Sequence, residues 1–337
     1  MLWQDYIFTP TLDATGDEIL KILRNPTVPH CKSIRIRQSY PKCSIQTLNE
    51  IVDLAAEKLT LRALSFGEDY YSLIFPERID KLVYLEVLYI DDSNIPCMPT
   101  TLCRLSCLYT LKFVFNKLET LPDEIGNLTN LMSLNLSSNR LKTLPTTCTK
   151  LVNLIDLNLN HNLMNNEAAR LIAVIVVKGL HKLIRLGVSG NKIQDKHEIL
   201  RLTILPNTIQ SLKEVDARHN PLDPVEFSGS SYFASSDWST IDKEIDQRLY
   251  GARVAREFSM RAVTSEDPIT EALKEKLPPF TANDWYKLFL CAFSHPEWGI
   301  SYNIDSVNLV YIIQTQYYDV VSKINDRASD EIFIFLK

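Results

Sequence analysis

The chain has 337 residues, of which 23% are charged and 45% hydrophobic, and its formal net charge at pH 7 is −5. These values are ordinary for a folded protein, and a negative net charge does not indicate a nucleic-acid-binding surface. The N-terminus has no basic segment followed by a long apolar run, so no cleavable signal peptide is predicted. The longest apolar run, 171–177, is too short for a transmembrane helix.

The cysteines give neither a disulfide framework nor a zinc pattern. There are seven, an odd number, with no cluster at either end of the chain, which favours a reducing compartment. Cys103 and Cys107 are four residues apart, but no second pair of cysteines or histidines completes a zinc site. We therefore expect neither a metal nor a cofactor.

Residues 1–30 are predicted to be an N-terminal helical cap. Thr15 and Glu18 have the spacing of a capping box, which opens a short helix that runs to about Arg24. The dipeptide Asn25-Pro26 ends this helix. The apolar residues of the helix would cover the open end of whatever follows.

The next segment alternates as a strand does. Over 31–37, Ile34 and Ile36 are expected to point inward and Arg35 and Arg37 outward. An amphipathic helix is predicted over about 44–58, and a second strand over 61–66.

A repeat governs the middle of the chain. The order Leu-x-x-Leu-x-apolar-x-x-Asn begins at Leu108, Leu131 and Leu154, with a period of 23 residues. Four prolines share this spacing and predict extended or 3₁₀-like return segments. Further unit starts and the prolines are Leu61, Leu85, Pro76, Pro99, Pro122 and Pro145.

The core of these units is predicted as stacked columns of apolar residues, because no single coil could bury a core alone. One column precedes each proline and two more follow it. They comprise Phe75, Met98, Leu121 and Leu144; Ile79, Leu102, Ile125 and Cys148; and Leu82, Leu105, Leu128 and Leu151.

Two later units, beginning at Leu183 and Leu212, are 29 residues apart. Their extra length predicts helices at about 166–178 and 195–203. Counting all units from residue 31, about eight carry a strand.

A polar column accompanies the leucines. An inward asparagine amide both donates and accepts hydrogen bonds, so it can satisfy backbone groups of adjacent coils that would otherwise be buried unpaired. Asp69 and Ser93 replace asparagine in two earlier units. The asparagines are Asn116, Asn139, Asn162, Asn191 and Asn220.

These units resemble the leucine-rich repeat family over residues 31–222. The 23-residue units are similar to its intracellular class, and the longer ones to its ribonuclease-inhibitor-like class. The resemblance implies an α/β solenoid with a parallel sheet on its concave side, and it implies no particular activity.

The pattern stops after residue 222. Residues 223–240 are predicted as a linker and 241–337 as a helical C-terminal domain. Some bacterial repeat proteins carry a helical ubiquitin-ligase domain whose nucleophilic cysteine is followed two residues later by aspartate. Here Cys291 is followed by Phe293, which favours a buried core cysteine.

The concave face carries the candidate binding residues, because strand positions that alternate with the buried leucines point to the opposite side. An open, wide face suits a protein partner better than a small molecule. A solvated sheet face without a partner is the alternative for any single position. The candidates are Arg35, Arg37, Tyr89, Asp91, Lys112, Phe115, Asn135, Asp156, Asn158, His161, Arg185, Asp216 and Arg218.

Three hypotheses of function follow. The first is a monomeric interaction scaffold that binds a protein, and not nucleic acid, through the concave face. The second is an enzyme in which the repeats select the substrate and the C-terminal helices react. The third concerns the setting. Mixed unit lengths are similar to those of repeat effectors that intracellular bacteria inject into host cells, and a housekeeping eukaryotic scaffold fits the solenoid equally well. The protein would accordingly be cytoplasmic, or delivered into a host cell without a signal peptide.

Overall fold

A computed structural model describes residues 11–27, 31–37, 43–66, 75–203, 205, 209–221, 245, 248 and 249. The predicted linker, Cys291, Asp69 and almost all of the predicted C-terminal domain lie outside these residues. All elements described below belong to one compact unit, Met1–Asp242.

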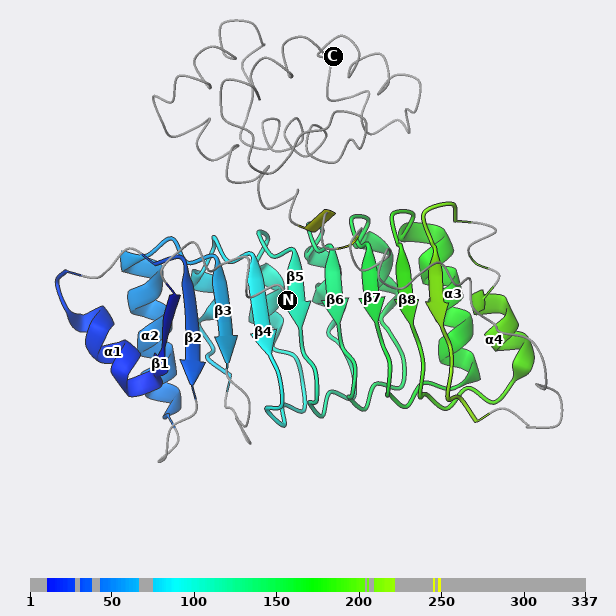
Figure 1. Cartoon of the computed structure of the whole chain (residues 1–337), viewed down its shortest axis with the longest axis horizontal. Coiled ribbons are helices and arrows are strands. Elements are labelled where there is room, and N and C mark those ends of the chain that lie inside the picture. Colours follow the sequence, from blue (N-terminus) through cyan, green and yellow to red (C-terminus); the bar gives the residue numbers. More distant parts are fainter. Residues whose placement is uncertain are drawn as a thin grey trace, which may run out of the picture. The chain divides into compact units, whose positions relative to one another are not determined.

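Nine parallel strands form a single sheet in which the spatial order equals the sequence order (Figure 1). Each strand pairs with the next without any change of register, so equivalent positions of successive coils lie side by side. The strands are β1 (Thr11–Thr15), β2 (Ser33–Arg37), β3 (Ala63–Phe66), β4 (Val87–Ile90), β5 (Thr110–Lys112), β6 (Ser133–Asn135), β7 (Asp156–Asn158), β8 (Arg185–Gly187) and β9 (Glu214–Asp216).

The N-terminal segment contributes a strand as well as the expected helix. β1 pairs with β2 from Thr11 opposite Ser33 to Thr15 opposite Arg37. Helix α1 (Gly16–Arg24) then begins with the predicted capping box between Thr15 and Glu18. The start of the chain is therefore a strand–helix unit that extends the sheet, and not a helix alone.

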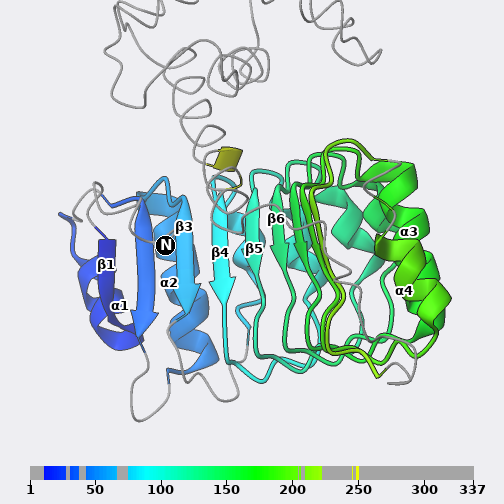
Figure 2. The same cartoon turned by 45° about the vertical axis from the view of Figure 1, so that its right-hand side comes forward.

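Helices and 3₁₀ turns cover one face of the sheet (Figure 2). The longer units carry α2 (Ile45–Lys58), α3 (Asn166–Gly179) and α4 (Lys196–Thr203), as predicted. The 23-residue units have room only for short 3₁₀ helices after an extended proline, such as Pro122 with φ −69° and ψ 150°. These short helices are η2 (Ile79–Lys81), η3 (Thr100–Arg104), η4 (Asp123–Asn127) and η5 (Thr146–Lys150).

The leucine core is continuous from coil to coil, as the stacked columns predict. Leu102 and Ile125 have no exposed surface, and Cys148 is 3% exposed. The neighbouring column is equally buried, with Leu128 at 0% and Leu151 at 1%. Each column residue therefore packs against its equivalents in the adjacent coils.

The asparagine column forms the predicted hydrogen-bond ladder. Asn139 Oδ1 accepts from the backbone N–H of Leu118 at 3.0 Å, and Nδ2 donates to the carbonyl oxygens of Phe113 at 2.6 Å and Leu136 at 3.1 Å. Each of the five asparagines accepts from the coil before it and donates to a carbonyl of that coil. Ser93 bonds only the carbonyl of Asp91, at 2.9 Å.

A second ladder, which the sequence analysis missed, lies at the turns that lead into the strands. Asn130 Nδ2 donates to the carbonyl oxygen of Ser106 at 2.8 Å, and Asn153 Nδ2 donates to that of Thr129 at 2.9 Å. Lys182 Nζ continues the series by donating to Asn153 Oδ1 at 2.8 Å. Side chains therefore connect the coils at both ends of the strands.

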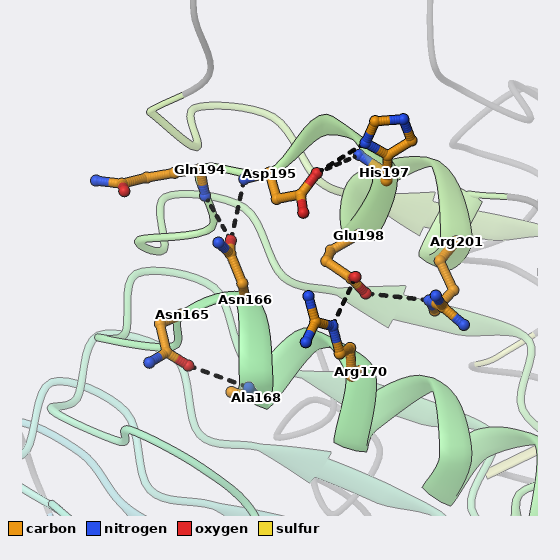
Figure 3. Close-up of polar contacts among 9 residues, drawn as sticks. All are labelled: Asn165, Asn166, Ala168, Arg170, Gln194, Asp195, His197, Glu198 and Arg201. Carbon is orange, nitrogen blue, oxygen red and sulfur yellow. Dashed lines mark hydrogen bonds and ion pairs between the residues drawn. The ribbon is translucent and has the colours of Figure 1, made fainter.

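Helices α3 and α4 are joined by a buried carboxylate (Figure 3). Glu198 is 3% exposed, and its two oxygens accept from Arg170 Nε at 2.7 Å and Arg201 Nε at 3.0 Å. Asn166 at the start of α3 accepts from the backbone N–H of Asp195 at 3.0 Å. These contacts hold the two helices of successive long units together.

Replacing Asn139 by alanine is expected to lower the free energy of unfolding by about 2 kcal/mol, because the Leu118 N–H and the Phe113 carbonyl lose their buried partner. Urea unfolding followed by circular dichroism measures the change. Asn135→Ala is the matched control, because Asn135 is half-buried on the other sheet face. Equal costs for the two variants would contradict the structural role of the ladder.

Glu198→Ala is expected to cost about 2 kcal/mol of stability, since it removes the buried partner of two arginines. Both arginines are more than half exposed, so they regain water and the cost stays below that of stranding a fully buried charge. Thermal unfolding compares this variant with Glu119→Ala, whose exposed pair with Lys142 at 3.8 Å contributes little. A smaller loss for Glu198→Ala than for Glu119→Ala would disprove the assignment.

Candidate protein-interaction face

The sheet face opposite the leucine core, called the concave face below, is ordered by the strand register into two rows. Residues of one row occupy the same place in successive strands, so they are neighbours at about 4.8 Å. The first row contains Val87, Thr110, Ser133, Asp156, Arg185 and Glu214, and the second contains Tyr89, Lys112, Asn135, Asn158, Gly187 and Asp216.

The first row is largely buried, and its central charges neutralise each other. Thr110 has no exposed surface, and Asp156 is 7% exposed. Asp156 accepts from Arg185 Nε at 2.8 Å and from the Ser133 hydroxyl at 3.3 Å. This row therefore stabilises the sheet face more than it offers groups to a partner.

The second row presents hydrogen-bond donors at its centre. Asn135 Oδ1 accepts from the N–H of Ser137, and Asn158 Oδ1 from that of Asn160, both at 3.0 Å. Each carbonyl oxygen is occupied by its own chain, while the side-chain NH₂ groups have no hydrogen-bond acceptor in the described part of the protein. With the ammonium group of Lys112 on the preceding strand, they form the donor row: Lys112, Asn135 and Asn158.

An aromatic residue supports one end of the donor row. The Lys112 ammonium lies 4.7 Å from the centroid of the Tyr89 ring, a cation–π distance. Tyr89 is only 5% exposed, so the ring orients Lys112 more than it offers surface of its own. The Asp91 carboxylate binds the next coil, because its Oδ1 accepts a hydrogen bond from the backbone N–H of Val114 at 3.2 Å.

The charged candidates at the two ends of the sheet pair with nearby groups. Arg37 contacts Asp13 of β1 at 3.1 Å. Arg218 contacts Asp216 at 2.9 Å, and Asp216 is 6% exposed. Neighbouring carboxylates therefore compensate the charges of Arg37 and Arg218.

Phe115 and His161 occupy a backbone position that sequence reasoning did not identify. Both directly precede a ladder asparagine and have positive φ values, 53° for Phe115 and 56° for His161. The Phe115 ring is 63% exposed. Phe115 therefore has both an unfavourable positive φ and an aromatic ring that is not buried. Gly190 holds the same position one coil after His161, and a Cβ there would lie 2.4 Å from His161 Nδ1, so the imidazole packs against this glycine.

The structure thus divides the predicted residues by accessibility, and the central ones lie side by side. The donor row and Phe115 lie on consecutive coils, whereas Arg35 and Arg37 belong to β2 and Arg218 follows β9. Exposed residues are Arg37, Phe115, His161 and Arg218; half-buried residues are Arg35, Asp91, Lys112, Asn135, Asn158 and Arg185; buried residues are Tyr89, Asp156 and Asp216.

Two buried cysteines of the repeats, Cys103 and Cys148, are unsuited to metal binding or nucleophilic chemistry. Burial raises the pKa of the Cys103 and Cys148 thiols to about 12. The thiolate is the form that binds metals and attacks electrophiles, and it is scarce at neutral pH when the pKa is that high. The described cysteines are free thiols.

Comparison with protein families finds a match for part of the chain. Residues 106–164 match the family model described as leucine rich repeat. A comparison with curated protein sequences finds no match. None of the described helices is both long enough and apolar enough to cross a membrane.

Solved structures similar to this chain include two repeat proteins. A leucine-rich repeat protein of Leptospira interrogans is 26% identical, with a TM-score of 0.44, and the match covers 56% of this chain and 43% of that one. An internalin of Listeria monocytogenes is 19% identical, with a TM-score of 0.41, over 57% of this chain and 55% of that one. The chain therefore spans about half the length of these structures.

Phe115→Asn is expected to raise the free energy of unfolding by about 0.5 to 1 kcal/mol, because asparagine tolerates a positive φ and the exposed ring contributes little packing. Chemical unfolding measures the change. Phe113→Ala, two residues earlier, removes a ring with no exposed surface and is expected to cost about 3 to 5 kcal/mol. Destabilisation by Phe115→Asn would show that Phe115 is needed for folding.

Proposed function

We propose that this leucine-rich repeat protein is an interaction scaffold that binds a partner protein through the concave face of its sheet. The observation that supports this proposal is the donor row. Lys112, Asn135 and Asn158 lie at equivalent positions of three consecutive strands, and each directs a donor group away from the leucine core.

The spacing of the donor row suits a protein better than a compact ligand. Three strands at about 4.8 Å distribute the donors over about 10 Å of nearly straight surface. Acceptors at such intervals are common along the carbonyl groups and carboxylates of a protein chain. A small molecule is usually enclosed on several sides, whereas this row lies on an open sheet face.

The surroundings of the row also favour a protein interface. Protein interfaces are enriched in aromatic residues, and they combine such anchors with polar groups. Phe115 provides an exposed ring directly after β5, and Tyr89 orients Lys112 from the neighbouring strand. A hydrogen bond contributes about 0.5 to 1.5 kcal/mol net, so three donors together determine a substantial part of a micromolar affinity.

We also propose that the partner is a protein of a host cell and that this chain acts as a bacterial effector there. The support is the mixture of 23- and 29-residue units, which resembles the unit lengths of injected repeat effectors. Affinity capture with the full chain from mammalian and from bacterial lysates tests this setting. Specific capture from the bacterial lysate alone would contradict it.

The triple variant Lys112→Ala, Asn135→Ala, Asn158→Ala is expected to weaken binding of a captured partner at least about tenfold, because about 1.4 kcal/mol corresponds to a factor of ten. Surface plasmon resonance with the full chain measures the affinity. The control replaces exposed residues of the same types on the 3₁₀ helices, Lys150→Ala with Asn127→Ala. If the control and the triple variant bind equally well, the concave face is not the site.

A further inference from the structure

Four loops continue the chain after β5 to β8 and form a rim beside the concave face. These rim loops comprise residues 115–120, 138–143, 161–165 and 190–195. In each, the residue that follows the ladder asparagine donates its N–H to a carbonyl of the preceding coil. Lys117 bonds Ile95 at 3.0 Å, and Arg140 bonds Leu118 at 2.9 Å.

This repeated backbone bond aligns equivalent residues of successive coils in one column. Leu163 and Lys192 continue it, bonded to the preceding coils at 2.9 and 2.8 Å. Lys117, Arg140 and Lys192 are exposed. These three residues are called the rim cations below.

The rim cations have no carboxylate partner among the described residues. The same loops contain two carboxylates, and both contact residues other than the rim cations. Glu119 faces Lys142 at 3.8 Å, and Asp195 accepts from His197. The rim is therefore a positive strip on a protein whose net charge is −5.

An apolar anchor accompanies the rim cations. Phe115 belongs to the same loop as Lys117, is 63% exposed and retains a positive φ of 53° that glycine or asparagine would adopt at less cost. On the preceding coil the equivalent position is Asp92, with φ 48°. The exposed aromatic ring and the first rim cation therefore both belong to the coil of β5, whereas the coil before it has an aspartate at the position of Phe115.

We infer that the rim loops bind an extended acidic segment of a partner protein, whose carboxylates contact Lys117 and Arg140 and whose apolar side chain packs on Phe115. This inference rests on the proposed function and specifies the chemistry of the partner. Three coil steps of about 4.8 Å separate Lys117 from Lys192, about 14 Å in total, which about four extended residues span.

Charge complementarity favours an acidic protein segment over nucleic acid. Nucleic-acid binding depends on neutralising many phosphates, and its non-specific part grows with the number of cations. Here only three cations share one column of the described loops, which also contains Leu163, and the chain as a whole is acidic. An alternating segment of carboxylates and apolar side chains matches this number and the exposed ring.

Fluorescence anisotropy with the full chain tests the inference. The probe is a fluorescein-labelled peptide, Gly-Glu-Leu-Glu-Phe-Glu-Gly, and the control peptide has glutamine in place of each glutamate. We expect binding at about 20 mM salt that weakens several-fold at about 200 mM, because exposed charges are screened. The glutamine peptide is expected to bind at least about tenfold more weakly, a difference of about 1.4 kcal/mol.

Variants locate the site. Lys117→Glu with Arg140→Glu is expected to abolish binding, and the milder Lys117→Gln with Arg140→Gln to reduce it. Lys150→Glu, a charge reversal on η5, is expected to leave it unchanged. Thermal unfolding confirms that each variant is folded.

Several outcomes would overturn the inference. These are no binding of the acidic peptide, equal binding of the glutamine peptide, undiminished binding by the rim variants, or tighter binding of a labelled single-stranded oligonucleotide. If the Lys112, Asn135 and Asn158 triple variant loses the peptide while the rim variants retain it, the proposed function stands and only the rim assignment fails. If a captured partner binds both the triple variant and the rim variants as tightly as the unchanged protein, the proposed function itself is wrong.

Discussion

The asparagine ladder is the constraint on which the remaining structure depends. Each coil leaves its strand through a buried turn whose backbone groups need partners, and one amide side chain supplies them from the next coil. The amide must point inward, so the chain reverses immediately before it through a positive φ. The ladder thereby determines which residues face out: Phe115 and His161 just before it, and Lys117 and Arg140 just after it.

Periodicity predicted the parts of the fold that depend on local pattern. Leucines, prolines and asparagines recur at fixed spacing. Their roles in the core, the return segments and the hydrogen-bond ladder depend only on their own coil and the adjacent one. β1 was missed because Thr11–Thr15 contains only two apolar residues, Leu12 and Ala14, and becomes a strand through pairing with β2. The second ladder was missed because asparagine stands at that position in only two successive units, at Asn130 and Asn153, which is too short a series to show as a column.

The sequence predicts on which face of the sheet the candidate side chains lie, but not how exposed they are. Alternation predicts Tyr89, Lys112 and Asp156 on the sheet face opposite the leucines, and the register aligns each with its equivalents in the adjacent strands. Alternation carries no information on exposure, which depends on side chains from other coils. The Asp156 carboxylate accepts from Arg185, 29 residues later. The Asn158 side chain uses only its carbonyl oxygen within the described residues, which accepts from the backbone N–H of Asn160, so its NH₂ group is available to a partner.

The proposed recognition of a partner depends on the separation of the structural residues from the surface residues. The ladder and the leucine columns occupy the inner positions, so the donor row and the rim cations can change without opening the core. Each of these outer groups contributes about 0.5 to 1.5 kcal/mol at most in an exposed setting. Useful affinity must therefore come from several coils acting together along the sheet. The constant register fits this requirement of the proposed scaffold, because it repeats the outer positions at one spacing and places Lys112, Asn135 and Asn158 in succession along the sheet.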